Sequence, residues 1–439
     1  MNLGRRRLHL GVLFPVNPTT TVWKGCRTGS QIDFDAIAGL ARTAERGRFD
    51  YLLLADDLRL PERNGEVTEI GVAGRHDLLT ILSSVSAVTE RLGLVATVNT
   101  TFNEPYDMAR QLATVNHLSG GRLGWNTVTT PDAWVGQNFR RGGFLPHAQR
   151  YERAAEFIRL CRSIWAADGT GGGVPLAHEG PHFHAGGLAA TAYDGVEPVL
   201  VQAGDSEQGR EFAAAHAEVV YSRKRGRAGR EFYADVKGRL ARHGRGPEQL
   251  KIMPAITYAV GQSRADAEEL ARTRRLDIVT PEMAIYYLEG LWGRDLSAYD
   301  PDGPLPDIAP DPDGAAFVTG RPTGTDAQRR ADRVAFLRQV AESRRLSIRQ
   351  LVALVTHTKA LAGTPSDIAT EMIDGVEGGG CDGYIIVPDR APGGLDDFVE
   401  HVVPELQSRG VLPAEYGSGT LRGHLGLPEH HRQPANRGR

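Results

Sequence analysis

The chain has 439 residues, a formal net charge of −3 at pH 7 and 41% hydrophobic residues. This near-neutral charge argues against nucleic acid or an anionic membrane surface as a partner, and no apolar run reaches the ~20 residues of a membrane-spanning helix. The three cysteines are odd in number and widely spaced, which argues against a disulfide framework and favours reduced thiols in a cytoplasmic protein.

The first residues are basic and then apolar, through MNLGRRRLHLGVLFPV. Pro15 and Asn17 interrupt this short run and no small-x-small cleavage pattern follows, so we interpret it as a first strand rather than a signal peptide. Further apolar runs recur along the chain. The eight predicted strands are His9–Val16, Tyr51–Ala55, Leu92–Val98, Arg122–Val128, Val199–Gln202, Glu218–Ser222, Lys251–Val260 and Tyr384–Val387.

Helical spacing of apolar residues appears between most of these strands. Gly47 supplies a stop for the first helix, Pro105 stands in the first turn of the third, and Pro404 should bend or restart the last. The predicted helices are Asp33–Arg46, Asp77–Thr89, Pro105–Leu118, Arg150–Trp165 and Asp396–Arg409.

Alternating strands and helices predict an α/β fold, and eight units predict a closed (β/α)8 TIM barrel. Such a barrel takes ~250 residues, so we expect one domain over residues 1–416 with insertions at about 129–146, 166–198 and 275–345. Pro301–Gly314 is interpreted as a mobile surface loop, and residues 417–439 as a polar, disordered tail. A doubly wound open sheet is the alternative, but no G-x-G-x-x-G follows the first strand.

Chemistry in a barrel lies at the carboxyl ends of the strands. Polar residues follow the second to fifth predicted strands there, and two more lie four residues apart on one helix face. The candidate site residues are Asp56, Thr100, Asn126, His147, Tyr151, Gly204 and Ser206.

The segment VLVQAGDSEQGREF combines a buried strand, a turn and a helix start. A helix N-terminus attracts anions such as phosphate, and Ser206 adds a hydroxyl. The whole set suits a polar heterocycle with a hydroxylated chain and a phosphate, such as flavin mononucleotide (FMN). One difficulty is that barrel phosphate sites commonly follow strands seven and eight, not strand five.

Each candidate also has a purely structural interpretation. Ser206 can be an N-cap with nothing bound, Asp56 a helix cap or surface carboxylate, Asn126 a turn residue and His147 a helix-start residue. The motif HEGPHFH, with His178, His182 and His184, fits no zinc spacing, and we expect no metal. The sequence has neither a G-x-S-x-G elbow nor a P-loop, so hydrolase and nucleotidase functions lack their motifs.

Several ordered motifs resemble one known family. They are Asn103-Glu104-Pro105-Tyr106 with Ala109-Arg110, SGGRLGWNTVTT, HAQRYERAAEF, VLVQAGDSEQGREFAAAHAE, GTPSDIATEM and CDGYIIVPDRAPGGLDDFVEHVVPELQSRG. From about His9 to about Leu427 the chain resembles flavin-dependent monooxygenases of the bacterial luciferase superfamily. The similar branch contains nitrilotriacetate and EDTA monooxygenases, dibenzothiophene-sulfone monooxygenase and pristinamycin IIA synthase.

This resemblance implies a luciferase-like barrel that uses reduced FMN from a separate NAD(P)H:flavin oxidoreductase. With O2 as co-substrate it would oxygenate a small organic substrate, with the protein assembled as a dimer or tetramer. The family motif places the flavin ligands at the seven candidate residues, with Asp56 and Asn126 near the isoalloxazine and Ser206 at the phosphate. Two alternatives stay open: an F420- or flavin-linked oxidoreductase on the same barrel, and a non-catalytic flavin-binding protein.

The sequence departs from the family where substrate would meet flavin. Asp57 replaces a usual Gly, Asn99 replaces a usual Ser or Thr, residues 355–362 are atypical, and Asn17–Trp23 replaces a His-rich loop. The resemblance therefore does not transfer a substrate. The Pro-, Gly- and Asp-rich Thr280–Thr325 is expected to be a mobile lid over the flavin cleft, with a passive surface loop as the alternative.

Overall fold

The computed structural model describes residues 6–14, 22–23, 32–56, 58–60, 62–63, 66–67, 76–130, 133–139, 147–166, 174–189, 196–311, 318–319, 327–356, 359–391 and 393–428. No helix in these ranges is both long enough and apolar enough to cross a membrane.

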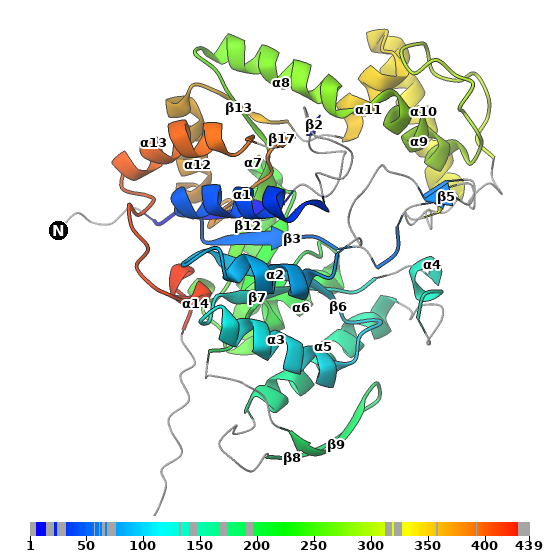
Figure 1. The fold of residues 1–439 in the computed structure, drawn as a ribbon. Coiled ribbons are helices and arrows are strands. Elements are labelled where there is room, and N and C mark those ends of the chain that lie inside the picture. Colours follow the sequence, from blue (N-terminus) through cyan, green and yellow to red (C-terminus); the bar gives the residue numbers. More distant parts are fainter. Residues whose placement is uncertain are drawn as a thin grey trace, which may run out of the picture.

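Eight parallel strands close into a barrel at the centre of the molecule (Figure 1). They are β1 (His9–Leu13), β3 (Tyr51–Leu54), β6 (Gly93–Asn99), β7 (Leu123–Val128), β10 (Val199–Gln202), β11 (Val219–Ser222), β12 (Lys251–Ile256) and β16 (Gly383–Ile386). Around the barrel they follow the order β1-β16-β12-β11-β10-β7-β6-β3. The predicted TIM barrel is therefore confirmed.

One predicted strand is divided in two. The run predicted as Lys251–Val260 stays in the barrel only to Ile256, and its remainder forms β13 (Tyr258–Val260). This short strand pairs with β15 (Leu361–Gly363) outside the barrel. The apolar run is continuous in sequence because both halves are buried, so the sequence pattern does not mark the break.

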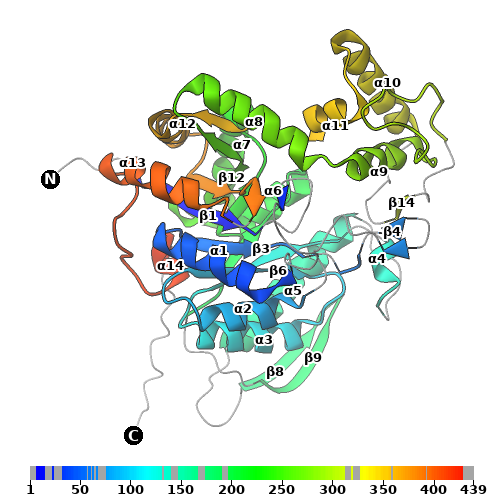
Figure 2. The same ribbon diagram turned by 45° about the horizontal axis from the view of Figure 1, so that its top comes forward.

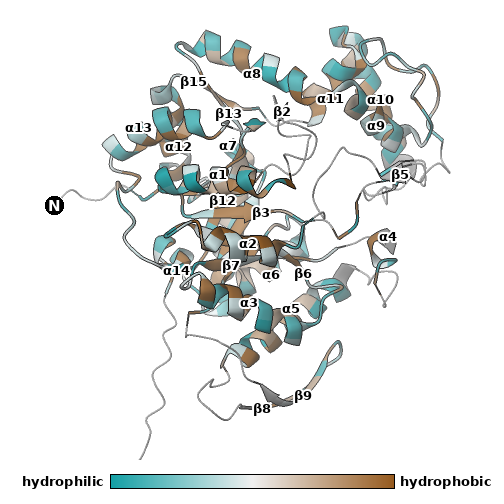
Figure 3. Ribbon diagram, in the orientation of Figure 1, coloured by the Kyte–Doolittle hydropathy of each residue, from teal (hydrophilic) through white to brown (hydrophobic). Residues whose placement is uncertain are grey.

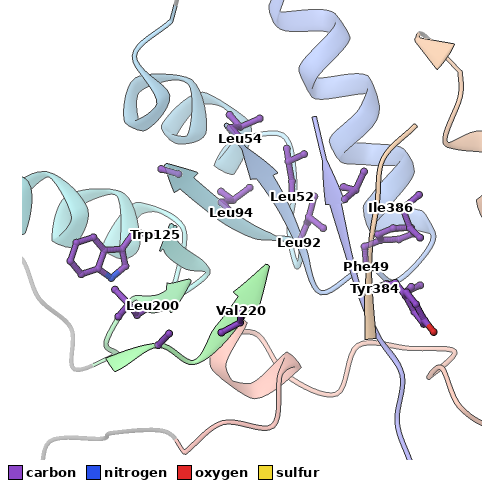
Figure 4. Close-up of a cluster of buried hydrophobic side chains, with 14 of the residues drawn as sticks. Phe49, Leu52, Leu54, Leu92, Leu94, Trp125, Leu200, Val220, Tyr384 and Ile386 are labelled. Atoms are coloured by element: carbon purple, nitrogen blue, oxygen red, sulfur yellow. The ribbon is translucent and has the colours of Figure 1, made fainter. Parts of the chain in front are cut away.

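Side chains alternate between the interior of the barrel and the helices outside. Tyr51, Val95, Val201 and Ile385 belong to the interior cluster. The Tyr51 hydroxyl lies 3.5 Å from Sδ of Met253, and this contact crosses the interior because β3 and β12 are not neighbours in the barrel. The intervening residues form the outer core drawn in Figure 4, among them Leu52, Leu94, Trp125, Leu200 and Ile386.

Helices cover the outside of the barrel, with hydrophobic residues among the hydrophilic ones (Figure 3). They are α1 (Phe34–Arg46), α2 (Leu78–Ser86), α3 (Pro105–Leu118), α5 (His147–Ala166), α6 (Glu207–His216), α7 (Gly226–Arg239), α12 (Pro365–Glu377) and α13 (Val403–Ser408). The short turns η2 (Leu240–His243) and η3 (Pro247–Gln249) follow α7. Before α13 the chain makes a π-helical turn, η5 (Phe398–Val402), and Pro404 stands in the first turn of α13, so the predicted restart is confirmed.

The amino-terminal end of the barrel is closed by a segment we expected to belong to a disordered tail. Residues 417–428 are part of the fold and contain α14 (Leu421–His424). Leu421, Leu425 and Leu427 are buried in the interior cluster. The expectation of disorder is thus wrong for 417–428, because these leucines fill the open end of the barrel, while 429–439 lie outside the described residues.

Two of the predicted insertions hold small elements. The insertion at 166–198 contains an antiparallel hairpin of β8 (Val174–Glu179) and β9 (His184–Ala189), and that at 129–146 contains α4 (Ala133–Gly136). Short strand pairs also form beyond the carboxyl ends of the barrel strands. Their members are β2 (Val22–Trp23) with β17 (Arg390–Ala391), and β4 (Glu62–Arg63) with both β5 (Glu66–Val67) and β14 (Val318–Thr319).

The large insertion is a helical group with its own core, set to one side of the barrel (Figure 2). Its helices are α8 (Arg264–Ile278), α9 (Pro281–Trp292), α10 (Ala327–Arg344) and α11 (Ile348–Thr356). The interpretation of Thr280–Thr325 as a loop is wrong for Pro281–Trp292. Thr280 caps that helix by accepting from the Met283 amide at 3.2 Å, and its apolar residues are buried.

The connection after α9 is irregular but anchored. The Asp311 amide donates to the Trp292 carbonyl at 2.7 Å, and the Trp292 indole donates to the Ile308 carbonyl at 3.0 Å. Ile348 and Arg349 donate backbone bonds to the carbonyls of Gly303 and Pro301. The predicted loop Pro301–Gly314 is thus irregular over 301–311, and 312–314 lie outside the described residues.

Candidate active site

Four neighbouring barrel strands carry five of the candidate residues. Because β3, β6, β7 and β10 are consecutive around the barrel and parallel, their carboxyl ends share one arc of its rim. Asp56 follows β3, Thr100 follows β6, Asn126 lies in β7, and Gly204 and Ser206 follow β10. The structure therefore brings these five together on that arc.

Asn126 points into the barrel, since it pairs in register with Val201 of the interior cluster. It is buried, and its amide nitrogen donates to Oγ1 of Thr97 at 3.2 Å. Within the described part of the chain, its Oδ1 has no hydrogen-bond partner. A buried acceptor of this kind is rare in folded proteins and fits a ligand that carries an N–H or O–H group.

Thr100 is fully buried directly after β6. Its amide and its hydroxyl both donate to the Val128 carbonyl, at 3.0 and 3.2 Å. The hydroxyl oxygen keeps lone pairs, so Thr100 can accept a bond from a ligand while its position is fixed by the backbone of β7.

Asn99, which departs from the family pattern, has a structural role in the turn after β6. Its Oδ1 accepts from the amides of Thr101 and Phe102, at 2.8 and 3.1 Å, and its side-chain amide donates to Oγ1 of Thr130. An Asn side chain that accepts backbone bonds two and three residues ahead builds a tight turn. Asn99 is 4% exposed, so this departure shapes the rim from below.

The turn between β10 and α6 has the form expected of an anion site. Ser206 is the N-cap of α6, and its Oγ accepts from the Gly209 amide at 3.1 Å. The Tyr151 hydroxyl, on α5, lies 3.5 Å from the same oxygen. The Tyr151 ring packs against Phe212 at a centroid distance of 5.4 Å, which fixes the phenol over the turn.

Two glycines leave space around this turn. A Cβ atom at Gly204 would collide with Nε2 of Gln202 and lie 2.9 Å from the Tyr151 hydroxyl. One at Gly209 would lie 2.9 Å from that hydroxyl and 3.1 Å from the Gly204 carbonyl oxygen. Both positions require glycine because backbone and phenol approach closely, and this leaves backbone N–H groups accessible as in phosphate-binding turns.

Acidic residues beside the turn are neutralised by neighbours. Glu207 forms an ion pair with Arg239 at 2.7 Å, and the hydrogen bond to Glu207 is the main cause that raises the pKa of the Arg239 guanidinium. Burial lowers the pKa of His216, at the end of α6, to about 4, so this imidazole is neutral at pH 7. The attraction for an anion therefore comes mainly from the helix N-terminus and its amides.

Two of the remaining candidates are only partly described. His147 is the first residue of α5, one turn before Tyr151, and its side chain lies outside the described part of the chain. Asp56 is partly buried, whereas Asp57 lies outside the described residues.

The His-rich motif has a structural role. His178 Nε2 lies 2.9 Å from Oε1 of Glu156, and the Glu156 carboxylate also accepts from the amides of His182 and Phe183. Burial disfavours ionisation of Glu156, but these hydrogen bonds outweigh it and lower the pKa of the carboxyl. Over the ranges that the structure describes, no three His, Cys, Asp or Glu side chains cluster as a metal site.

Sequence reasoning missed two charged residues on α5. Arg153 and Glu156 are each 1% exposed and hold the turn after β6 and the β8–β9 hairpin. Their signal was in the sequence, because both lie beside apolar positions of the helix at a spacing of three. A charge on the buried face of an amphipathic helix implies a specific partner.

A closed barrel with a glycine-lined anion turn after its fifth strand, and a buried amide acceptor on the same arc, defines an enzyme class that binds a phosphorylated heterocycle. Residues 16–382 match the luciferase-like monooxygenase family, and the chain belongs to this family. It is therefore a monooxygenase of a group of flavin-dependent oxygenases, as its motifs predicted.

Relatives match over nearly the whole chain. Nitrilotriacetate monooxygenase component A of Aminobacter aminovorans is 36% identical, over 97% of each chain. A subunit of pristinamycin IIA synthase from Streptomyces pristinaespiralis is 38% identical, over 97% of this chain and 98% of the relative. The solved structure of EDTA monooxygenase from Chelativorans sp. BNC1 is 28% identical, with a TM-score of 0.74 over 97% of this chain and 99% of that one.

Proposed function

We propose that this protein is the oxygenase component of a two-component system that uses reduced FMN and O2 to oxygenate a small organic substrate. The observation that carries the proposal is the arc formed by the Ser206 turn, the Tyr151 phenol and the unpaired acceptor of Asn126. These groups offer an anion site and a polar, water-poor surface on the same rim, as FMN requires.

The residues fit FMN in two ways. The cradle around Gly204 and Gly209 would be filled by any Cβ atom, so it suits a group as compact as a phosphate held by Ser206 and Tyr151. Asn126 Oδ1 is an acceptor suited to an N–H of the isoalloxazine, with Thr100 and Asp56 farther along the arc. When bound, reduced FMN supplies the electrons that activate O2, and one oxygen atom goes to the substrate.

The protein's own contribution is binding, orientation and exclusion of water. Ser206 and the α6 amides hold the anion, Tyr151 lies over them, and His147 begins the same helix one turn earlier. Of the two relatives above, one is named as a component and the other as a subunit, which supports a partner. We propose that this partner is an NAD(P)H:flavin oxidoreductase, and that the protein is a cytoplasmic homodimer or homotetramer.

The test separates three functions. The purified protein is mixed with FMN and NADH, with and without an added flavin reductase, and O2 uptake and binding of photoreduced FMN are measured. A two-component monooxygenase binds reduced FMN and oxygenates a substrate from a candidate panel only when the reductase is present. Turnover with reduced F420 and no O2 uptake would favour hydride transfer on the same barrel. Flavin binding without any turnover would favour a non-catalytic protein.

A further inference from the structure

The buried guanidinium of Arg153 lies under the rim of the candidate site. Arg153 is 1% exposed and projects from α5 toward the turn that follows β6. Its Nε donates to the carbonyls of Thr100 and Thr101, both at 3.2 Å, and Nη2 lies 3.4 Å from the Asn103 carbonyl. One side chain thus holds several consecutive carbonyls of this turn.

The same guanidinium also holds the β8–β9 hairpin. Nη1 donates to the His182 carbonyl at 3.3 Å, and the guanidinium carbon lies 4.0 Å from the centre of the Phe183 ring. Glu104, just before α3, lies 3.8 Å from Nη2. Arg153 therefore joins α5, the turn after β6 and the hairpin at one buried point.

These contacts connect two halves of the candidate site. Thr100 lies at the end of β6, whereas Tyr151 lies on α5, two residues before Arg153. The two halves belong to different elements, and the Arg153 bonds fix the spacing between them. A displacement of about 1 Å in such a framework can strongly reduce binding or turnover.

We propose that Arg153 is a positioning residue for the flavin site, which sets the separation between the Thr100 and Tyr151 halves. This inference rests on the proposed function. Arginine is required because its planar fork presents donors in fixed directions and stacks on an aromatic ring, whereas a lysine ammonium has no such plane. Glu156, one turn later, assists by accepting from the amides of His182 and Phe183.

The chain offers a matched control at the opposite end of the barrel. Arg122 is also buried, and its guanidinium donates to the carbonyls of Ser119, Leu92, Ser86 and Thr89. It lies just before β7, at the amino-terminal end of the strand, away from the candidate site. Arg122→Lys thus loses a comparable set of backbone bonds without touching the rim.

The experiment compares Arg153→Lys and Arg122→Lys with the parent protein. Thermal unfolding measures stability, anaerobic titration with photoreduced FMN measures Kd, and visible circular dichroism reports how firmly the bound flavin is held. We expect both variants to unfold at lower temperature. Only Arg153→Lys should bind reduced FMN about tenfold more weakly or worse, with a reduced dichroic signal.

A parent-like Kd for Arg153→Lys, or an equal loss of affinity in both variants, overturns the inference while leaving flavin binding by the parent intact. Failure of the parent to bind reduced FMN overturns the proposed function, and the positioning role with it. If Arg153→Lys does not fold, Phe183→Leu takes its place, because it removes the ring under the guanidinium and keeps the donors. It should weaken binding in the same direction, and an unchanged Kd there also counts against the inference.

Discussion

Arg422 and Glu218 form a buried ion pair where α14 closes the barrel. Arg422 is 1% exposed, its Nη1 lies 3.1 Å from Oε2 of Glu218, and its Nη2 contacts the other carboxylate oxygen. Glu218 Oε2 also accepts from the Leu200 amide at 3.1 Å. The pair therefore connects the carboxyl-terminal segment to β10 and to the start of β11.

We expect Arg422→Ala to destabilise the protein by about 3–5 kcal/mol, because it leaves the Glu218 carboxylate buried without its partner. Chemical unfolding followed by circular dichroism measures this loss. The control is Arg227→Ala, which removes the exposed pair with Glu231 on α7 and should cost less than about 0.5 kcal/mol. Equal losses in the two variants would show that burial of the Arg422 pair has no energetic consequence.

Truncation tests the closure of the barrel in a second way. Removal of residues 417–439 exposes the interior cluster, since Leu421, Leu425 and Leu427 leave it, and each buried leucine contributes about 1.5–3 kcal/mol. We expect this truncation to unfold the protein or to leave it aggregated. Removal of 429–439 alone keeps every described contact, and its thermal unfolding should match that of the parent. A folded, parent-like 1–416 protein would contradict the closing role of α14.

The barrel could be predicted from the sequence because its signals are local. Each strand is a short apolar run followed by a helix with apolar residues at a regular spacing, as in Val199–Gln202 and α6. The site residues at the strand ends were found for the same reason. Ser206 lies directly between a strand and a helix, and its predicted role as N-cap is confirmed.

The parts that were missed depend on contacts between distant residues. Leu421, Leu425 and Leu427 stand among glycines and polar residues, so only the barrel interior that they fill reveals them as core. Arg153 binds carbonyls that lie about fifty residues earlier in the sequence, and no local pattern names those partners. In Pro281–Trp292 the helix signals were present, but the Pro- and Gly-rich residues that follow dominated the interpretation.

Ser206→Ala should weaken binding of reduced FMN by about 1–3 kcal/mol, since it removes a hydroxyl that bonds a charged group. It also removes an N-cap, which costs about 1 kcal/mol of stability. Ser263→Ala separates the two effects, because Ser263 caps α8 in the same way, accepting from the Asp266 amide at 3.2 Å. Anaerobic titration should show weaker flavin binding only for Ser206→Ala, and equal affinity in all three proteins would rule out a phosphate at this turn.

Asn126→Leu tests whether the unpaired acceptor is kept for a ligand. A leucine of similar size removes an unsatisfied buried oxygen, so we expect the free energy of unfolding to stay within about 1 kcal/mol of the parent value. Affinity for reduced FMN should fall about tenfold or more, as a hydrogen bond of about 1.5 kcal/mol is lost. A large loss of stability with unchanged flavin affinity would assign Asn126 a structural role instead.

The pairing of β14 with β4 tests the proposed lid. Val318 pairs with Arg63 and Thr319 with Glu62, so the helical insertion is tied to the segment that follows Asp56. The double variant Val318→Pro/Thr319→Pro breaks this ladder, because proline lacks the N–H and disfavours a paired strand. If the insertion excludes water from the flavin, hydrogen peroxide released per FMN oxidised, with substrate present, should rise about twofold or more while flavin affinity stays near the parent value. Arg349→Ala is the control: it removes bonds to the carbonyls of Val279 and Leu276 inside the helical group and should lower stability without raising peroxide release. Peroxide release at the parent level in the proline variant would show that the insertion does not gate the site.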